Sequence, residues 1–227
     1  MATQLQDQAQ TQEALVRSLS ILDPSQPHSF LKPVKKIHEG HDVPRFLTSR
    51  AYGDIGRFVM QLNIAMCPRK APDKDSSVQT WTLSSSLELS EPVRRIQELL
   101  QIIDAIIEEA PPDTGPRRFG NFAFRKWYEI LGERVPDLLK EYLPAEVLQF
   151  GGGSTGEVSA LDELAPYLLG GFGSAQRLDY GTGHELSFLA FLGCIWKLGG
   201  FTKEFSSDGN LERSIVLGII EPYVYVF

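Results

Sequence analysis

Apolar residues recur at helical spacing along two long stretches of the chain. The first runs from Phe46 to Met66 and stops at Pro68, and the second runs over residues 91–110 after Ser90. Steps of three, four or seven positions place apolar side chains on one face of an α-helix. Serine before such a run and proline after it are typical of helix ends. The pattern therefore predicts two amphipathic helices, the second being the better defined.

Three further helices are predicted in the second half of the chain. One begins near Asn121, is interrupted before Pro136 because proline lacks a backbone donor, and resumes to Tyr142. Another covers residues 158–168. The last, over 184–198, is apolar on nearly every face, which predicts a helix surrounded by other helices. No alternation of strands and helices accompanies them, so the predicted fold class is all-α.

Two polar segments interrupt this pattern. Residues 68–89 are rich in proline, lysine, aspartate and serine, which predicts a loop or a disordered insertion. The first twenty residues contain five glutamines and no apolar stretch long enough for the core of a signal peptide. We therefore expect residues 1–27 to form a polar, flexible N-terminus.

Composition narrows the function classes. With 22 basic and 29 acidic residues, the net charge is −7, which argues against a nucleic-acid partner. The longest apolar tract, 186–198, contains Lys197 and is shorter than the ~20 residues of a membrane-spanning helix. Cys67 and Cys194 are too few for a disulfide framework or a four-ligand zinc site. We therefore expect buried thiols and a cytoplasmic or nuclear protein with no membrane partner.

A glycine pattern at residues 151–156 resembles a nucleotide fingerprint without its context. Gly151, Gly153 and Gly156 match the spacing G-x-G-x-x-G. No alternating strands surround them, and Glu157 would place a negative charge where a phosphate should bind. A flexible loop is the better interpretation.

The segment from Gly170 to Glu185 carries the strongest candidate chemistry. Thr182 and Glu185 fit a capping box ahead of an apolar run, so a helix should begin there with Thr182 as its N-cap. A helix N-terminus offers unpaired N–H groups, and Arg177 lies close enough to add a guanidinium, which together favour phosphate binding. The alternative is purely structural, with Arg177 paired to Asp179 and the glycines permitting a tight turn. Spacing alone leaves both interpretations open.

Two neighbouring features carry weaker signals. His184 could be a general acid or base or a metal ligand, but no second ligand stands at helical spacing, because Phe188 occupies the position four residues on. Residues 117–127 interleave four basic side chains with aromatic ones, which could indicate nucleic-acid stacking. The acidic net charge favours packing and groove lining instead.

Four segments resemble the serine/threonine-protein phosphatase 2A activator family, also called phosphotyrosyl phosphatase activators, and its fungal members in particular. They are RRFGNFAFRKWY at 117–128, GGFGSAQRLDYGTGHELSFLAFL at 170–192, VPRFLTSRAYGDIGRFV at 43–59 and FLKPVKKI at 30–37. The run DYGTGHE at 179–185 is the most specific. The resemblance covers about residues 28–225 and implies one helical domain over 28–227.

The resemblance implies an all-α fold with a core, a linker and a lid around a cleft. Family members are described as peptidyl-prolyl cis-trans isomerases that bind the phosphatase 2A catalytic subunit with its scaffold subunit, bind ATP with magnesium, and promote the metal-loaded phosphatase. By motif matching, Arg177, Thr182 and Gly183 take the ATP-contacting positions. Rotation of an X-Pro bond needs no proton transfer, so no catalytic triad is expected. Asp179 and Tyr180 are the candidates for contacting a proline-containing peptide.

The resemblance also implies that something is missing. Family members continue into a segment that supplies magnesium-contacting residues and part of the ATP pocket, so no metal ligand is assigned here and the last helices are expected to be absent. An apolar stripe near the end of the chain is then expected to be exposed; it comprises Val216, Ile219, Ile220, Tyr223 and Phe227. Two alternatives stay open, a non-catalytic module that binds the phosphatase and an inactive, truncated fragment.

Overall fold

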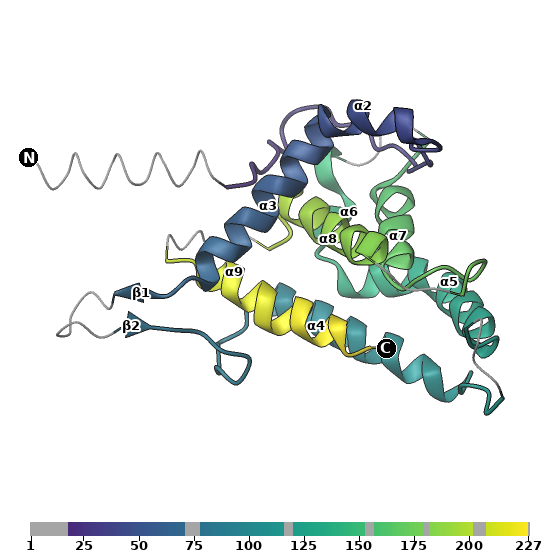
Figure 1. The fold of residues 1–227 in the computed structure, drawn as a ribbon. Helices are drawn as coiled ribbons and strands as arrows, with labels where there is room; N and C mark the ends of the chain where they lie inside the picture. The colour runs from purple at the N-terminus through teal and green to yellow at the C-terminus, as the bar shows by residue number, and fades with distance from the viewer. Residues whose placement is uncertain are drawn as a thin grey trace, which may run out of the picture.

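The fold is built almost wholly from helices (Figure 1), which confirms the all-α prediction. The computed structural model describes residues 18–70, 78–115, 120–152, 157–178, 182–201 and 208–226. Within these ranges the only strands are β1 (Arg69–Lys70) and β2 (Val78–Gln79), which pair antiparallel. The longer helices are α3 (Arg50–Met66), α4 (Glu91–Ala105), α5 (Ala123–Tyr142), α7 (Ala160–Gly170) and α8 (Thr182–Lys197). Short helices between them are η1 (Gly40–Asp42), α2 (Val43–Leu47), η2 (Ile106–Glu108), α6 (Ala145–Leu148) and η3 (Phe150–Gly152). The final helical run consists of α9 (Asn210–Ile215), η4 (Val216–Ile220) and α10 (Glu221–Val224).

The second predicted helix is confirmed as α4. The first, predicted from Phe46 to Met66, is divided, because Phe46 lies on α2, which ends at Leu47, and α3 begins only at Arg50. α3 begins after Ser49, whose hydroxyl accepts the backbone N–H of Tyr52. α4 begins after Ser90, and it buries the apolar face Val93, Ile96, Leu99, Leu100 and Ile103. Ser90 has the extended backbone of an N-cap, but its Oγ is buried without a hydrogen-bond partner. The helix is therefore held by its packed face rather than by this cap.

The interruption predicted before Pro136 is wrong, because α5 continues through it. The ring of a proline inside a helix crowds the carbonyl four residues earlier, here that of Gly132, and its nitrogen cannot donate a hydrogen bond. Leu131, Val135 and Leu139 on the same helix are fully buried. Burial of this face outweighs the single hydrogen bond that Pro136 cannot donate.

α8 lies at the centre of the molecule, between α3 and α7 (Figure 1). It buries Phe188, Phe191, Leu192, Ile195 and Trp196. The prediction that helices surround α8 holds only in part, because Leu186 is 39% exposed and one side of α8 faces a cavity.

The apolar stripe at the end of the chain is not exposed, contrary to the sequence-based expectation. α9, η4 and α10 form one helical rod that lies along α4 (Figure 1), and Ile219 and Tyr223 are buried. The Tyr223 ring stacks on Phe188 at a centroid distance of 3.8 Å. The described part of the chain thus supplies its own partner for this stripe, while Phe227 lies outside the described residues.

The two polar segments are partly ordered where they are described. In the N-terminal segment, expected to be flexible, Leu19 is 2% exposed and its carbonyl accepts the indole N–H of Trp196 at 2.8 Å, whereas residues 23–27 are exposed. In the 68–89 segment, β1 and β2 pair around residues 71–77, which lie outside the described ranges together with residues 1–17. Among the described residues, no helix combines the length and apolarity needed to cross a membrane.

Candidate functional site at the start of helix α8

The turn between α7 and α8 is held by hydrogen bonds to its backbone carbonyls. α7 ends at Gly170, and the Gly170 carbonyl is 2.7 Å from Nδ1 of His184 on the first turn of α8. The next carbonyl, that of Gly171, accepts the Tyr223 hydroxyl at 2.5 Å. A Cβ at Gly171 would lie 3.1 Å from the Cβ of Phe188, so glycine lets α7 and α8 approach closely here. The turn is therefore tied both to α8 and to the C-terminal rod.

His184 positions Arg177 at this helix start. A carbonyl oxygen only accepts, so Nδ1 of His184 must donate to Gly170. Nε2 of the neutral ring can then accept from Nη2 of Arg177, which is 3.4 Å away. Because both ring nitrogens make these contacts, His184 acts as a bridge between the turn and the guanidinium rather than as a metal ligand. Sequence reasoning missed this role, since spacing does not show which carbonyl the ring meets.

The loop that carries Arg177 is a tight turn. It is supported by Arg125 on α5 and by Gly120, which precedes that helix. The Ser174 hydroxyl accepts the backbone N–H of Arg177 at 3.2 Å, and the Ser174 carbonyl accepts that of Leu178 at 2.7 Å. Leu178 has a φ of 53°, a left-handed conformation that costs a non-glycine residue about 1–2 kcal/mol. Nε of Arg125 on α5 donates to the Ala175 carbonyl at 3.1 Å. The segments 120–128 and 170–178, far apart in sequence, therefore meet at this loop.

Gly120 is the second support that sequence reasoning did not identify. It has a φ of +88°, and a Cβ there would lie 2.6 Å from the Leu178 carbonyl oxygen. Only glycine combines this conformation with so close an approach.

The predicted site residues fall into two groups. Arg177 and Gly183 are exposed, Thr182 is the first residue of α8, and a Cβ at Gly183 would meet open space. Asp179 and Tyr180 lie outside the described residues, so their roles stay predictions. α8 begins at Thr182 itself, so Thr182 is its first residue and not the N-cap that the capping box predicted. The described residues contain no group of three or more His, Cys, Asp or Glu side chains that could hold a metal ion.

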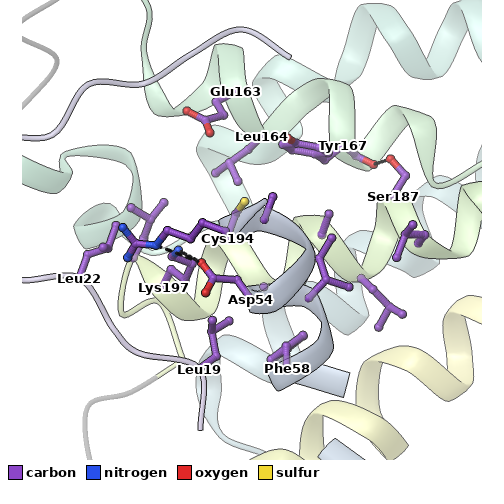
Figure 2. Close-up of a pocket in the computed structure, with 18 of the residues that line it drawn as sticks. Leu19, Leu22, Asp54, Phe58, Glu163, Leu164, Tyr167, Ser187, Cys194 and Lys197 are labelled. Atoms are coloured by element: carbon purple, nitrogen blue, oxygen red, sulfur yellow. Dashed lines mark hydrogen bonds and ion pairs between the residues drawn. The ribbon is translucent and has the colours of Figure 1, made fainter. Parts of the chain in front are cut away.

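A cavity of about 640 Å³ extends along α8 from this helix start (Figure 2). α3, α7 and α8 form its walls together with residues 19–30. Most lining side chains are apolar, and they include Phe30, Phe46, Ile55, Phe58, Leu164, Leu186, Leu189 and Ala190. At one end Lys197 of α8 pairs with Asp54 of α3, as Figure 2 shows.

Two ionisable groups on the cavity wall are held in their neutral forms. Burial raises the pKa of the Cys194 thiol to about 12, and burial also raises the pKa of Tyr167. A thiol with so high a pKa is protonated at neutral pH and is a poor nucleophile. Cys194 is therefore a wall residue, as expected of a buried thiol, whereas Cys67 is exposed, contrary to that expectation.

Comparison with known proteins places the chain in a family. The family model described as phosphotyrosyl phosphate activator (PTPA) protein matches residues 33–227. A serine/threonine-protein phosphatase 2A activator 1 from Aspergillus fumigatus is 53% identical over 210 residues, which are 92% of this chain and 44% of the relative. The Saccharomyces cerevisiae protein of the same name is 35% identical and is matched over 80% of this chain and 42% of its own length.

A solved structure agrees with these matches. The crystal structure of the PP2A phosphatase activator Ypa1 is 32% identical and has a TM-score of 0.68, covering 92% of this chain and 58% of the other. The chain thus spans about half the length of the curated relatives it matches. The family match includes the Gly170–Glu185 turn, both of its supports and the C-terminal rod. This chain belongs to the phosphotyrosyl phosphate activator (PTPA) family.

Proposed function

We propose that this chain is an activator of protein phosphatase 2A and that it binds ATP through Arg177 and the start of α8. The names of its relatives support the first part, since they match over 92% of this chain. The observation that carries the second part is the contact of the Arg177 guanidinium with His184, which keeps a positive charge beside the open first turn of α8.

The hydrogen-bond donors at the start of α8 are of the kind that bind a polyphosphate. The first N–H groups of a helix have no partner within it, and the positive end of the helix dipole favours anions. Residues 182 and 183 would supply such N–H groups, and Arg177 would supply a guanidinium fork. Glu185 on the same turn is the one acidic side chain there, and it is exposed to solvent.

Magnesium fits this site only as a companion of the phosphates. Mg²⁺ keeps several waters and commonly binds through one or two carboxylates plus substrate phosphates. That mode needs no group of three ligands, which the described residues do not offer. When bound, the ion would neutralise part of the phosphate charge. Arg177 and the helix start would orient the nucleotide.

We also propose that the chain acts on an X-Pro bond, as the family resemblance implies. The barrier to rotation about an X-Pro bond is ~20 kcal/mol and arises from amide resonance. A surface that binds the twisted peptide bond more tightly than the planar one is therefore enough to catalyse the rotation. Asp179 and Tyr180 remain the candidates for peptide contact. The expected partners are the phosphatase catalytic subunit with its scaffold subunit.

The nucleotide site is tested by calorimetric titration of the purified chain with ATP and Mg²⁺. The substitution Arg177→Glu should weaken ATP binding at least roughly tenfold, because an anion replaces the guanidinium. Arg94→Glu is the matched control, since Arg94 is also exposed but lies on α4. Unchanged ATP affinity in the Arg177 variant would contradict the phosphate site.

The activator role is tested separately with the phosphatase core enzyme. Adding the chain with ATP and Mg²⁺ to the catalytic and scaffold subunits should raise the rate of phosphopeptide hydrolysis. Isomerisation of a proline peptide is measured in parallel. Binding and activation without isomerisation would indicate a docking module, whereas a folded chain that neither binds nor activates would contradict the proposal.

A further inference from the structure

Part of the wall of the cavity along α8 has no regular secondary structure. This part comes from residues 19–30, and hydrogen bonds hold it in place. The Leu19 N–H donates to Gln61 Oε1 at 2.8 Å, and the Leu22 N–H donates to the Lys197 carbonyl at 2.7 Å. Beyond the segment, the Leu31 N–H donates to Glu163 at 2.7 Å. The cavity is therefore a defined feature of the fold, and its volume of about 640 Å³ lies within the range of ligand sites.

Three cations gather around one carboxylate at one end of this cavity. Asp54 is 9% exposed, and three cations surround its carboxylate. Lys197 pairs with one oxygen, Arg57 Nη1 lies 3.1 Å from the other, and Arg50 Nε lies 3.7 Å away. Of these cations only Arg50 and Lys197 line the cavity. The only other acidic side chain in the lining, Glu163, is on α7 and accepts the backbone N–H of Leu31.

Arg50 is the cation that could receive a ligand. Its side chain is 74% exposed and lines the cavity, and its Nη groups have no hydrogen-bond partner among the described residues. Lys197 is 21% exposed and already occupied by Asp54. A guanidinium fork at the end of an apolar cavity suits a planar carboxylate, with two parallel N–H donors.

We propose that this cavity binds a single-chain amphipathic carboxylate, with its hydrocarbon body along α8 and its head group at Arg50. The apolar walls from Phe58 to Ala190 would cover the hydrocarbon. The charged end would fix its direction, because a carboxylate placed among apolar side chains without a cation would be strongly disfavoured. This site is separate in chemistry from the phosphate site, and neither nucleotide nor phosphatase is needed to test it.

The test is calorimetric titration of the purified chain with decanoate and, in parallel, with decanol. Decanol has the same number of carbon atoms without the charge. Arg50→Gln should weaken decanoate binding roughly tenfold and leave decanol binding unchanged, because only decanoate pairs with the guanidinium. Arg45→Gln is the matched control, since Arg45 is exposed on α2 but does not line the cavity.

A substitution that fills the cavity tests whether the hydrocarbon of the ligand binds there. Ala190→Phe should weaken binding of both molecules at least roughly tenfold by occupying the apolar space. Met60 is 54% exposed on the outer side of α3, so Met60→Phe should change the binding of neither molecule. Saturable one-to-one binding with these responses supports the proposal. It is overturned if wild-type chain binds neither molecule, if Ala190→Phe has no effect in a variant that still melts cooperatively, or if Arg50→Gln weakens decanol as much as decanoate.

Discussion

At the residue scale, the start of α7 shows how one carboxylate links fold stability to pH. Asp162 accepts hydrogen bonds from the Ser159 hydroxyl at 2.5 Å and the Ser159 N–H at 2.8 Å, which completes a capping box. These two bonds lower the pKa of Asp162 below its ordinary value. The folded state therefore gains stability above the unfolded pKa of ~3.9, and it loses this stability as pH falls through the lower folded pKa.

The substitution Asp162→Asn should lower the melting temperature at pH 7 by about 2–4 °C, the effect of losing a cap in a chain of this size. At an acidic pH below the lowered folded pKa of Asp162, the difference from the wild type should largely disappear, because Asp162 is then protonated. Circular-dichroism melts at pH 7 and at that acidic pH measure this. Asp137→Asn is the control, since Asp137 is highly exposed and pairs only with Lys140 on its own helix. An equal loss at both pH values would rule out the charged cap as the cause.

At the element scale, the Arg177 loop depends on a residue in another segment. Gly120→Ala would place a Cβ 2.6 Å from the Leu178 carbonyl at a φ that alanine avoids. We expect destabilisation of more than about 1 kcal/mol, and weaker ATP binding because the loop must shift. Gly115→Ala, where a Cβ meets nothing within 4 Å, should change neither quantity. Urea unfolding and ATP titration measure both effects, and ATP affinity that survives a clear loss of stability would show that the loop is held independently of Gly120.

Local signals predicted the helices well where caps and prolines agree with packing. α4 begins after Ser90 as predicted, and Pro68 and Pro111 follow the helical stretches that they close. The start of α3 after Ser49 was not predicted, since that helix was expected to begin at Phe46. The local signals failed at Pro136, because burial of neighbouring side chains on α5 outweighs the cost of a proline inside the helix. Sequence patterns predicted only the part of the candidate site that lies within the segment from Gly170 to Glu185. Its supports come from residues fifty or more positions away, and neither periodicity nor spacing contains such contacts.

At the scale of the whole molecule, one hydrophobic core joins both ends of the described chain. Leu19 and Tyr223 belong to the same cluster of buried side chains as the central helix α8. The indole N–H of Trp196 bonds to the Leu19 carbonyl across 177 positions of sequence. A core of this kind should unfold as one unit.

Ile219 tests whether the C-terminal rod belongs to that unit. Its side chain is fully buried in the rod that packs on α4, so Ile219→Ala should destabilise the chain by about 2–5 kcal/mol through lost burial and the cavity left behind. Val224→Ala, in the same rod but 56% exposed, should cost far less. Urea unfolding followed by circular dichroism and by tryptophan fluorescence should give coincident transitions for wild type and both variants, because Trp127 and Trp196 report on the core. If the Ile219 variant lost helical signal before tryptophan fluorescence changed, the rod would unfold separately, and its packing on α4 would not be part of the cooperative core.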